Sequence, residues 1–236
     1  MIHWSKTQKV VVAVAASAFM AGCGGGGSGS DTTAAPSAYP VAAAFDRLLT
    51  TQATFSANTA DGTASISQTF APGAQGQFSA TSPVSKTISI STVIRQNGVV
   101  SSTDQSLIYF NSNPLTFVAA FAKAVQQSTA LPVTASIGAS GRAYITPGVG
   151  RGLFSTPPQE GTWSLEAGSN GRAWLCLTNQ LGYGLLSSPS FEVTYLNTYC
   201  FSIDANGVAS GYKATLATDR RSTLANPVVD TSRFGS

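Results

Sequence analysis

The chain of 236 residues contains a single histidine, His3, and only 10% of its residues are charged. Histidine supplies the general base of Ser-His-Asp and Cys-His nucleophiles and the ligands of most catalytic zinc sites. The segment that contains His3 is interpreted below as a cleaved signal, so the exported protein would lack histidine altogether. Chemistry that depends on an imidazole is therefore excluded from the predicted functions.

An excess of charge of one sign is also missing. The full chain has 13 lysine and arginine residues and 10 acidic residues. Lys6 and Lys9 belong to the first segment, and the other basic residues are scattered along the chain, with one adjacent pair at Arg220-Arg221. A balance this close to neutral gives no electrostatic reason to expect a nucleic acid or an anionic lipid surface as the partner. We therefore predict no nucleic-acid partner.

The apolar run Val10–Met20 is too short to cross a bilayer as a helix, because a crossing takes ~20 residues. Two lysines precede the run, and the small residues Ala21 and Gly22 follow it. A basic start, a short apolar segment and small residues before the cleavage point are typical of an export signal. We therefore predict that residues 1–22 are a signal peptide.

Ala21-Gly22-Cys23 resembles the lipobox of bacterial lipoproteins, although Met20 stands where leucine is more usual. The resemblance implies that Cys23 becomes the acylated first residue and anchors the protein to a membrane. One fatty chain, at ~0.8 kcal/mol per buried CH₂, binds a membrane only marginally, so stable anchoring needs two or more chains. Gly24, in place of an aspartate, resembles lipoproteins that are sorted to the outer membrane. The alternative is an ordinary secretory signal cleaved after Ala18.

Glycine and serine dominate the segment Gly24–Ser30, and such runs behave as random coil. We interpret residues 23–40 as a flexible tether between the acyl chains and the folded part. The folded part is long enough for one large or two small domains. The predicted division is an N-terminal β lobe with a short helix, residues 41–130, and a C-terminal β lobe with a disulfide, residues 131–236. Leu131-Pro132 marks the boundary.

Cysteine occurs three times in the chain. Once Cys23 is acylated, Cys176 and Cys200 remain as an even pair in an oxidising compartment, where a disulfide is the default. The crosslink would tie adjacent or facing strands together. Closing a loop of about 25 residues stabilises a fold by ~3–4 kcal/mol in the chain-entropy model. A redox-active pair is the alternative, and the lack of C-x-x-C spacing disfavours it.

Apolar residues at helical spacing follow Pro40 and predict one short amphipathic helix that ends near Thr50: Val41, Phe45, Leu48 and Leu49. Beyond it the period changes to two. In Phe191–Ile203, aromatic and aliphatic residues share one face, and polar residues occupy most of the other. Alternation of this kind builds sheets with one buried and one solvated face. We predict an all-β protein of antiparallel β-sandwich-like sheets in two sequential lobes; the alternative is one large sandwich or an open barrel.

Asx-Gly pairs between alternating runs are the strongest short-range signal of a hairpin. They occur at residues 61–62, 97–98, 170–171 and 206–207 and predict four hairpins: Thr51–Ala71, Lys86–Phe110, Gly161–Thr178 and Phe191–Ala217. Asp204 opens the last of these turns, which we interpret as an Asx turn rather than a calcium loop.

Asn113–Val125 fits either a capped helix or an irregular crossover. Arg142–Gln159 is mostly loop, with one short strand at Arg142–Thr146.

From Gln105 to Val208 the chain resembles a group of uncharacterised exported bacterial proteins and lipoproteins. Three places carry the resemblance: Tyr109–Pro114; Leu131-Pro132 with Ile137–Gly141; and the closing segment with Trp163–Leu165, Cys176, Cys200 and Ile203–Gly207. The match covers less than half of the chain and consists mostly of turn residues. It implies export, β-structure and the disulfide, and it implies no activity.

Few residues offer catalytic chemistry. Glu160, Glu166 and Glu192 could supply the acid and the base of a glycan hydrolase. Strand parity points Glu166 and Glu192 toward solvent, where carboxylates make poor general acids. Five aromatic residues could stack against a sugar or peptide if they met on an open surface, although the core is their usual place: Trp163, Trp174, Tyr183, Tyr195 and Tyr199. We therefore predict no catalytic residue, no cofactor and no metal site.

The first functional hypothesis is a non-enzymatic envelope lipoprotein, held at the outer membrane by its lipid anchor, whose β-domain binds or scaffolds an envelope protein or glycan. It rests on the predicted anchor, tether and disulfide and on the lack of catalytic side chains. One alternative is a carboxylate-dependent hydrolase of envelope glycans, which needs two acidic residues in one cleft. The other is a subunit of a secretion or adhesion apparatus, which needs an exposed sheet edge or a flat apolar patch.

Overall fold

The described part of the chain consists of one helix and thirteen strands in two antiparallel sheets. The structure is a computed structural model that describes residues 36–148, 158–184, 191–222 and 225–235. Side chains are described in these ranges except at 181–184, 191–195, 218–222 and 225–231. Residues 34–236 form one compact unit.

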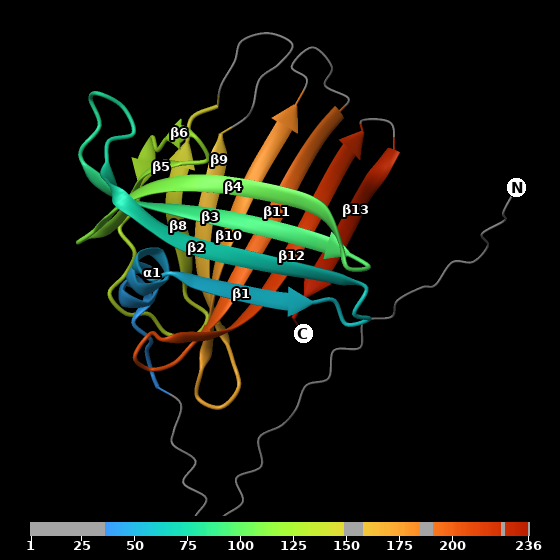
Figure 1. The fold of residues 1–236 in the computed structure, drawn as a ribbon, viewed down its shortest axis with the longest axis horizontal. Helices are drawn as coiled ribbons and strands as arrows, with labels where there is room; N and C mark the ends of the chain where they lie inside the picture. Colours follow the sequence, from blue (N-terminus) through green and yellow to red (C-terminus); the bar gives the residue numbers. More distant parts are fainter. Residues whose placement is uncertain (1–35, 149–157, 185–190, 223–224, 236) are drawn as a thin grey trace, which may run out of the picture. The chain divides into compact units, whose positions relative to one another are not determined.

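The strands follow chain order within each sheet (Figure 1). Sheet 1 has six strands in the order β1-β2-β3-β4-β5-β6: Ala53–Asn58, Ala64–Gly76, Ser85–Gln96, Val99–Ser112, Leu115–Ala120 and Lys123–Ala124. Sheet 2 has seven strands, β7 to β13, in the reverse order β13-β12-β11-β10-β9-β8-β7: Gln127–Ser128, Ser140–Thr146, Gln159–Ala167, Ala173–Gly184, Phe191–Ile203, Ala209–Ser222 and Ala225–Phe234. The predicted all-β fold of antiparallel sheets with one short N-terminal helix is confirmed.

The chain passes from sheet 1 to sheet 2 between two consecutive residues. The Val125 amide donates to the Val118 carbonyl in sheet 1 at 2.9 Å, and the Gln126 amide donates to the Ile145 carbonyl in sheet 2 at 2.8 Å. This crossing point lies shortly before the predicted boundary at Leu131-Pro132. Each sheet therefore uses one continuous half of the folded chain, yet buried residues from both halves form a single hydrophobic cluster.

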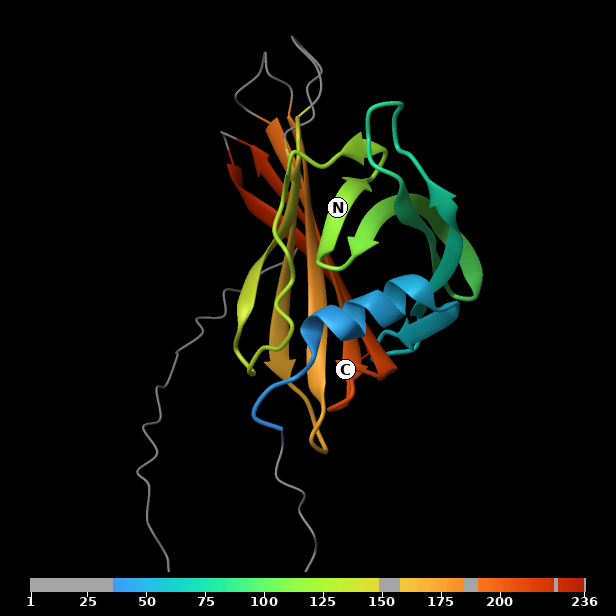
Figure 2. The ribbon, with the colours of Figure 1, turned by 90° about the vertical axis from the view of Figure 1, so that its left-hand side faces the viewer.

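The helix α1, Val41–Thr50, has the bounds that the sequence predicts. Its apolar face is buried at the four predicted positions and at Ala44. Figure 2 shows α1 lying between the two sheets. It contacts β2 of sheet 1, and Ala44 packs beside Gly207 in the β11–β12 turn of sheet 2. The helix therefore acts as a spacer that covers apolar surface from both sheets.

All four predicted hairpins are confirmed, and each turns at its Asx-Gly pair. The glycine adopts a left-handed φ of 68° to 80° in each turn, a conformation that glycine reaches without a steric penalty. At the first turn, hydrogen bonds from the Thr59 hydroxyl and from Thr63 lower the pKa of Asp61 to about 2. At the last turn, the amides of Asn206 and Val208 donate to Asp204 Oδ1 at 2.9 Å. The interpretation of Asp204 as the first residue of an Asx turn is confirmed.

The helix considered for Asn113–Val125 is wrong, because this segment forms β5 and β6. Leu115, Phe117 and Ala119 are buried with a period of two, whereas Thr116 and Val118 are half-buried. Backbone pairing with β4 places Leu115 opposite Ser112. Asn113-Pro114 is therefore the turn of a β4–β5 hairpin rather than the start of a helix. The short strand predicted at Arg142–Thr146 is confirmed as β8.

Cys176 and Cys200 form a disulfide between directly opposed residues of β10 and β11. Of the two arrangements that the sequence left open, the crosslink therefore joins adjacent strands. Both residues are buried on the outer face of sheet 2. Their neighbours Leu175, Leu177 and Phe201 point to the opposite face, toward sheet 1.

Reducing this disulfide should lower the free energy of unfolding by ~3–4 kcal/mol, because the unfolded chain regains the entropy of a loop of this size. The sequence separation of the two cysteines is 24 residues. Urea unfolding of the oxidised protein, the reduced protein and the Cys176→Ala/Cys200→Ala variant measures the difference. Equal unfolding midpoints for all three, or two free thiols in protein taken from the periplasm, would contradict the prediction.

Candidate functional site

A cavity of about 770 Å³ lies between the inner faces of the two sheets. Phe45, Leu48 and Leu49 of α1 form one wall, and strands from both sheets form the others. The volume falls within the ~300–1,000 Å³ of typical small-molecule sites. Because neither sheet contains the cavity alone, its existence depends on how the two sheets are spaced.

The wall from sheet 1 consists of two rows that run across β2, β3 and β4. Gln68, Thr92 and Asp104 pair in register and form a polar row. Its members become more exposed along the row, from 4% at Gln68 and 8% at Thr92 to an exposed Asp104 on β4. Phe70, Ile90 and Ser106 form the adjacent row. The polar row thus leads from the solvent to the interior.

The wall from sheet 2 also consists of paired rows. Leu177 on β10 lies opposite Tyr199 on β11, and Asn179 lies opposite Asn197. All four residues line the cavity. The Cys176–Cys200 disulfide lies on the same two strands, one residue away from the Leu177–Tyr199 pair and on the other face. The crosslink therefore fixes the register of this wall without entering the cavity.

Aromatic contacts join the two sheets at one corner. Phe55 and Phe70 of sheet 1 meet Phe201 of sheet 2, with the Phe70 and Phe201 ring centroids 5.6 Å apart at 77°. Tyr212 on β12 packs against Phe55 and Phe201. Edge-to-face pairs of this kind contribute ~0.5–1.5 kcal/mol beyond their buried area.

A second corner joins β5 to β8. The rings of Phe117 and Tyr144 are 5.1 Å apart, and the Tyr144 hydroxyl donates to Asn179 Oδ1 at 2.8 Å. Burial raises the pKa of Tyr144, so the phenol stays protonated and keeps donating. A Cβ at residue 161 would overlap the Tyr144 ring. Glycine at this position therefore lets the ring reach the cavity wall.

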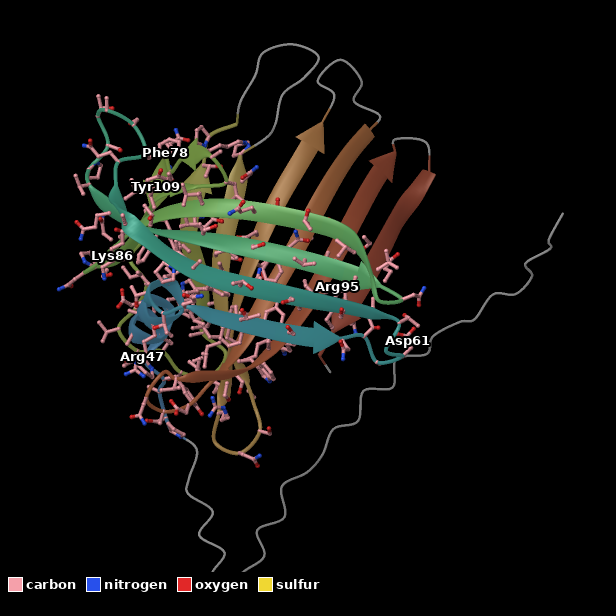
Figure 3. The ribbon with its side chains drawn as sticks, in the orientation of Figure 1. Arg47, Asp61, Phe78, Lys86, Arg95 and Tyr109 are labelled. Carbon is pink, nitrogen blue, oxygen red and sulfur yellow. A yellow bond between two sulfur atoms is a disulfide. The ribbon has the colours of Figure 1, made fainter. Side chains whose placement is uncertain are left out.

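The rim of the cavity includes part of a free sheet edge. β4 pairs with β3 along most of its length, but with β5 only from Tyr109 onward. Residues Asp104–Tyr109 line the cavity, and all of them except Tyr109 lie in the part of β4 that has no second partner among the described strands. Phe78, from the segment between β2 and β3, packs edge-on against Tyr109 at 5.5 Å (Figure 3). Lys123 on β6 also lines the rim, and partial burial lowers its pKa.

Tyr199 is the tyrosine of the cavity wall whose ionisation responds to a charge at the rim. Burial, together with the negative charge of Asp104, raises the pKa of Tyr199 to about 12. The neutral phenol is thus favoured in the folded state. Its contribution to stability is fully present below pH 10, the ordinary tyrosine value, and is lost as the pH rises through about 12.

Of the five aromatic residues considered in the sequence, the three whose side chains the structure describes lie in different places. Trp163 is buried in the core, and Trp174 lies on the outer face of sheet 2, with Lys213 Nζ 4.9 Å from its ring centroid. Tyr199 lines the cavity. The side chains of Tyr183 and Tyr195 lie outside the described residues.

Two of the three glutamates considered as catalytic acids or bases form surface ion pairs. Glu160 Oε1 lies 2.6 Å from Arg142 Nε, and Glu166 Oε2 lies 2.9 Å from Lys213 Nζ. Neither glutamate lines the cavity, and the Glu192 side chain lies outside the described residues. The hydrolase hypothesis therefore gains no pair of acidic residues in this cavity.

One group of potential metal ligands occurs among the described residues. Ligand atoms of Glu166, Cys176 and Cys200 lie within 4.8 Å of one another. The two sulfurs are bonded to each other, so neither offers a thiolate to a metal. Cys23, the predicted lipidation site, lies outside the described residues together with the predicted signal peptide.

Sequence reasoning missed most of the cavity. Phe70, Phe117, Ile90 and Leu177 carry the ordinary alternation of core strands, and nothing in that pattern shows that the facing sheet is held at a distance. Gln68 on β2 and Gln159 on β9 were local signals, because each long amide stands on the buried parity of its strand. A polar residue at such a position calls for a partner or a ligand.

No protein-family model matches the chain, and neither does any curated protein or solved structure. Among the described residues, no helix has the length and hydropathy that a membrane crossing requires.

Replacing Asp104 with asparagine should lower the pKa of Tyr199 from about 12 toward its burial-only value, because the carboxylate no longer opposes ionisation. Carbon-13 labelling of tyrosine rings, followed by NMR from pH 8 to 13, resolves the titration. Asp61→Asn is the matched control, since Asp61 lies in the β1–β2 turn and does not line the cavity. Equal Tyr199 titration curves in both variants would contradict the assignment.

Proposed function

We propose that this chain is a non-enzymatic lipoprotein of the cell envelope, whose β-domain binds a small, largely apolar molecule between its two sheets. The cavity is the single observation that carries the binding role. Its size suits a small molecule, and its walls are mostly aromatic and aliphatic, with a few polar groups from both sheets. A sandwich that served only as a scaffold would gain stability by closing such a space.

The lack of catalytic side chains supports binding over catalysis. Among the described residues that line the cavity, Asp104 and Lys123 are the only charged ones. Acid–base hydrolysis of a glycan needs two carboxyl groups about 5–9.5 Å apart, and the described lining supplies one. The predicted exported protein also lacks histidine.

The proposed location rests on Cys23. Acyl chains on this residue would hold the β-domain at a membrane through the Gly/Ser-rich tether, and Gly24 favours the outer membrane. In that arrangement the cavity would take up its ligand in the cell envelope.

The second candidate is docking of an envelope protein on the free edge of β4, as in a secretion or adhesion apparatus. Val99 and Val100 are 71% and 49% exposed, and much of β4 has no second partner among the described strands, so a partner strand could pair with it. Residues 101–105 of this strand are all polar or charged, however, and such edges resist strand addition. The cavity therefore supports the first candidate more strongly.

Binding can be tested with N-phenyl-1-naphthylamine, an apolar dye whose fluorescence rises when it leaves water. We expect saturable binding to the full chain carrying Cys23→Ala, which removes the acyl chains from the assay. Leu177→Trp should weaken binding of the dye roughly tenfold or more. The indole occupies space that the dye needs, and the apolar contact that the dye loses is worth more than ~1.4 kcal/mol. Leu196→Trp is the matched control, since Leu196 is exposed on the neighbouring strand and does not line the cavity.

Unchanged affinity in Leu177→Trp, or equal losses in both tryptophan variants, would contradict binding in the cavity. Thermal unfolding of each variant checks that the fold is kept. If Leu177→Trp is unstable, Ile90→Phe fills the same space from sheet 1.

The anchor can be tested by fractionation of cells that express the wild-type chain or Cys23→Ala. The wild type should sediment with outer membranes, and the variant should be found in the soluble fraction, because it has lost the acylated residue. Mass spectrometry of the mature N-terminus identifies the modification. An unmodified N-terminus at Phe19, or a variant that still sediments with membranes, would contradict the proposal.

A further inference from the structure

Two buried amide side chains give the cavity a polarity that its volume alone does not reveal. Gln68 on β2 is 4% exposed and Gln159 on β9 is 6% exposed, and both line the cavity from opposite sheets. The Oε1 atom of each has no hydrogen-bond partner among the residues that the structure describes. Buried amide oxygens are nearly always hydrogen-bonded in proteins, so these two atoms call for a donor inside the cavity.

The surroundings of Gln68 explain which of its atoms remains unpaired. Its Nε2 donates to Thr92 Oγ1 at 3.3 Å. The amide nitrogen is therefore held by the neighbouring strand, and the oxygen is the end that remains. The same row continues to Asp104 at the rim, whose carboxylate also accepts hydrogen bonds. From the rim to the interior, this row offers mainly acceptors to an incoming molecule.

The charges of the lining act against an anionic ligand. Among the described lining residues Lys123 is the only cation, and it lies at the rim, near exposed Ala122. No arginine or histidine of the described lining faces the two buried amide oxygens. A carboxylate or phosphate at that depth would meet further acceptors and lose its hydration, which is strongly unfavourable.

The rest of the lining suits a long apolar body. Aliphatic and aromatic side chains from the helix and both sheets cover most of the space: Phe45, Leu48, Ile90, Ile108, Phe121 and Leu177. A molecule that fits these walls and also satisfies the amide oxygens needs an apolar body and a polar end that donates hydrogen bonds.

We propose that the cavity selects linear amphipathic molecules with a hydrogen-bond-donating, non-anionic head group, such as a long-chain alcohol or amine. The head group donates to the Oε1 atom of Gln68 or of Gln159, and the chain lies against the apolar walls. This inference rests on the proposed binding function and specifies the ligand class for the same cavity. It also accounts for two long amides at positions whose parity otherwise favours apolar residues.

The test is displacement of N-phenyl-1-naphthylamine from the full chain carrying Cys23→Ala by three ligands: dodecan-1-ol, its methyl ether and dodecanoate. Dodecan-1-ol should bind about threefold to tenfold more tightly than the ether, which corresponds to one neutral hydrogen bond gained over the ether, since the ether oxygen only accepts. Dodecanoate should bind more weakly than the alcohol at pH 8.

Methionine replaces glutamine with nearly the same shape but without an acceptor of comparable strength. Gln68→Met and Gln159→Met should each reduce the preference for the alcohol over the ether, with both ligands compared in the same variant. Gln180→Met is the matched control, because Gln180 is exposed and does not line the cavity. If Gln68→Met fails to fold, the preference of Gln159→Met for the alcohol over the ether tests the inference alone.

The outcomes separate the ligand class from the binding function. Equal displacement by alcohol and ether, a preference that survives both methionine variants, or tightest binding of dodecanoate would overturn the donor selectivity and leave cavity binding intact. Absence of saturable dye binding would overturn both. Loss of the preference in the two methionine variants and not in Gln180→Met supports the inference.

Discussion

The spacing between the two sheets is the constraint on which the rest of this structure depends. Their inner faces meet through aromatic rings at one corner, where Phe70 packs on Phe201, and through Phe117 and Tyr144 at the other. Between these corners, α1 inserts Phe45, Leu48 and Leu49 from the side. Because bulky groups fix the separation at three places, the central rows of the sheets remain apart, and the space between them becomes a cavity.

Other features of the fold keep that spacing constant. The disulfide locks β10 to β11 on the outer face of sheet 2, so Leu177 and Tyr199 keep their register on the inner face. At one corner the Gly235 amide donates to the Asn58 carbonyl at 2.8 Å and ties the end of the chain to β1. At the other, the Phe117 amide donates to Ser128 Oγ at 2.8 Å and joins the sheets beside their crossing point. The walls are therefore rigid elements, which suits a preformed binding site.

The sequence predicted the local structure well and the cavity poorly, for a physical reason. Helical spacing in Val41–Leu49, period-two alternation in Phe191–Ile203 and Asx-Gly turns are short-range signals, and the structure has a helix, a strand and hairpin turns at these places. The helix considered for Asn113–Val125 was wrong because the apolar residues of this segment fit a period of two and a helical spacing equally. Backbone pairing with β4 selects the strand. The cavity depends on side chains far apart in sequence, such as Gln68 and Gln159, whose juxtaposition no local pattern encodes.

Locating a heavy-atom ligand in a crystal of the protein tests the central claim most directly. Crystals of the Cys23→Ala chain soaked with 12-bromododecan-1-ol should show an anomalous bromine peak between the two sheets. The hydroxyl should lie within hydrogen-bond distance of Gln68 Oε1 or Gln159 Oε1. A bromine peak confined to the outer faces of the sheets, or inner faces packed together without space for the chain, would contradict the account.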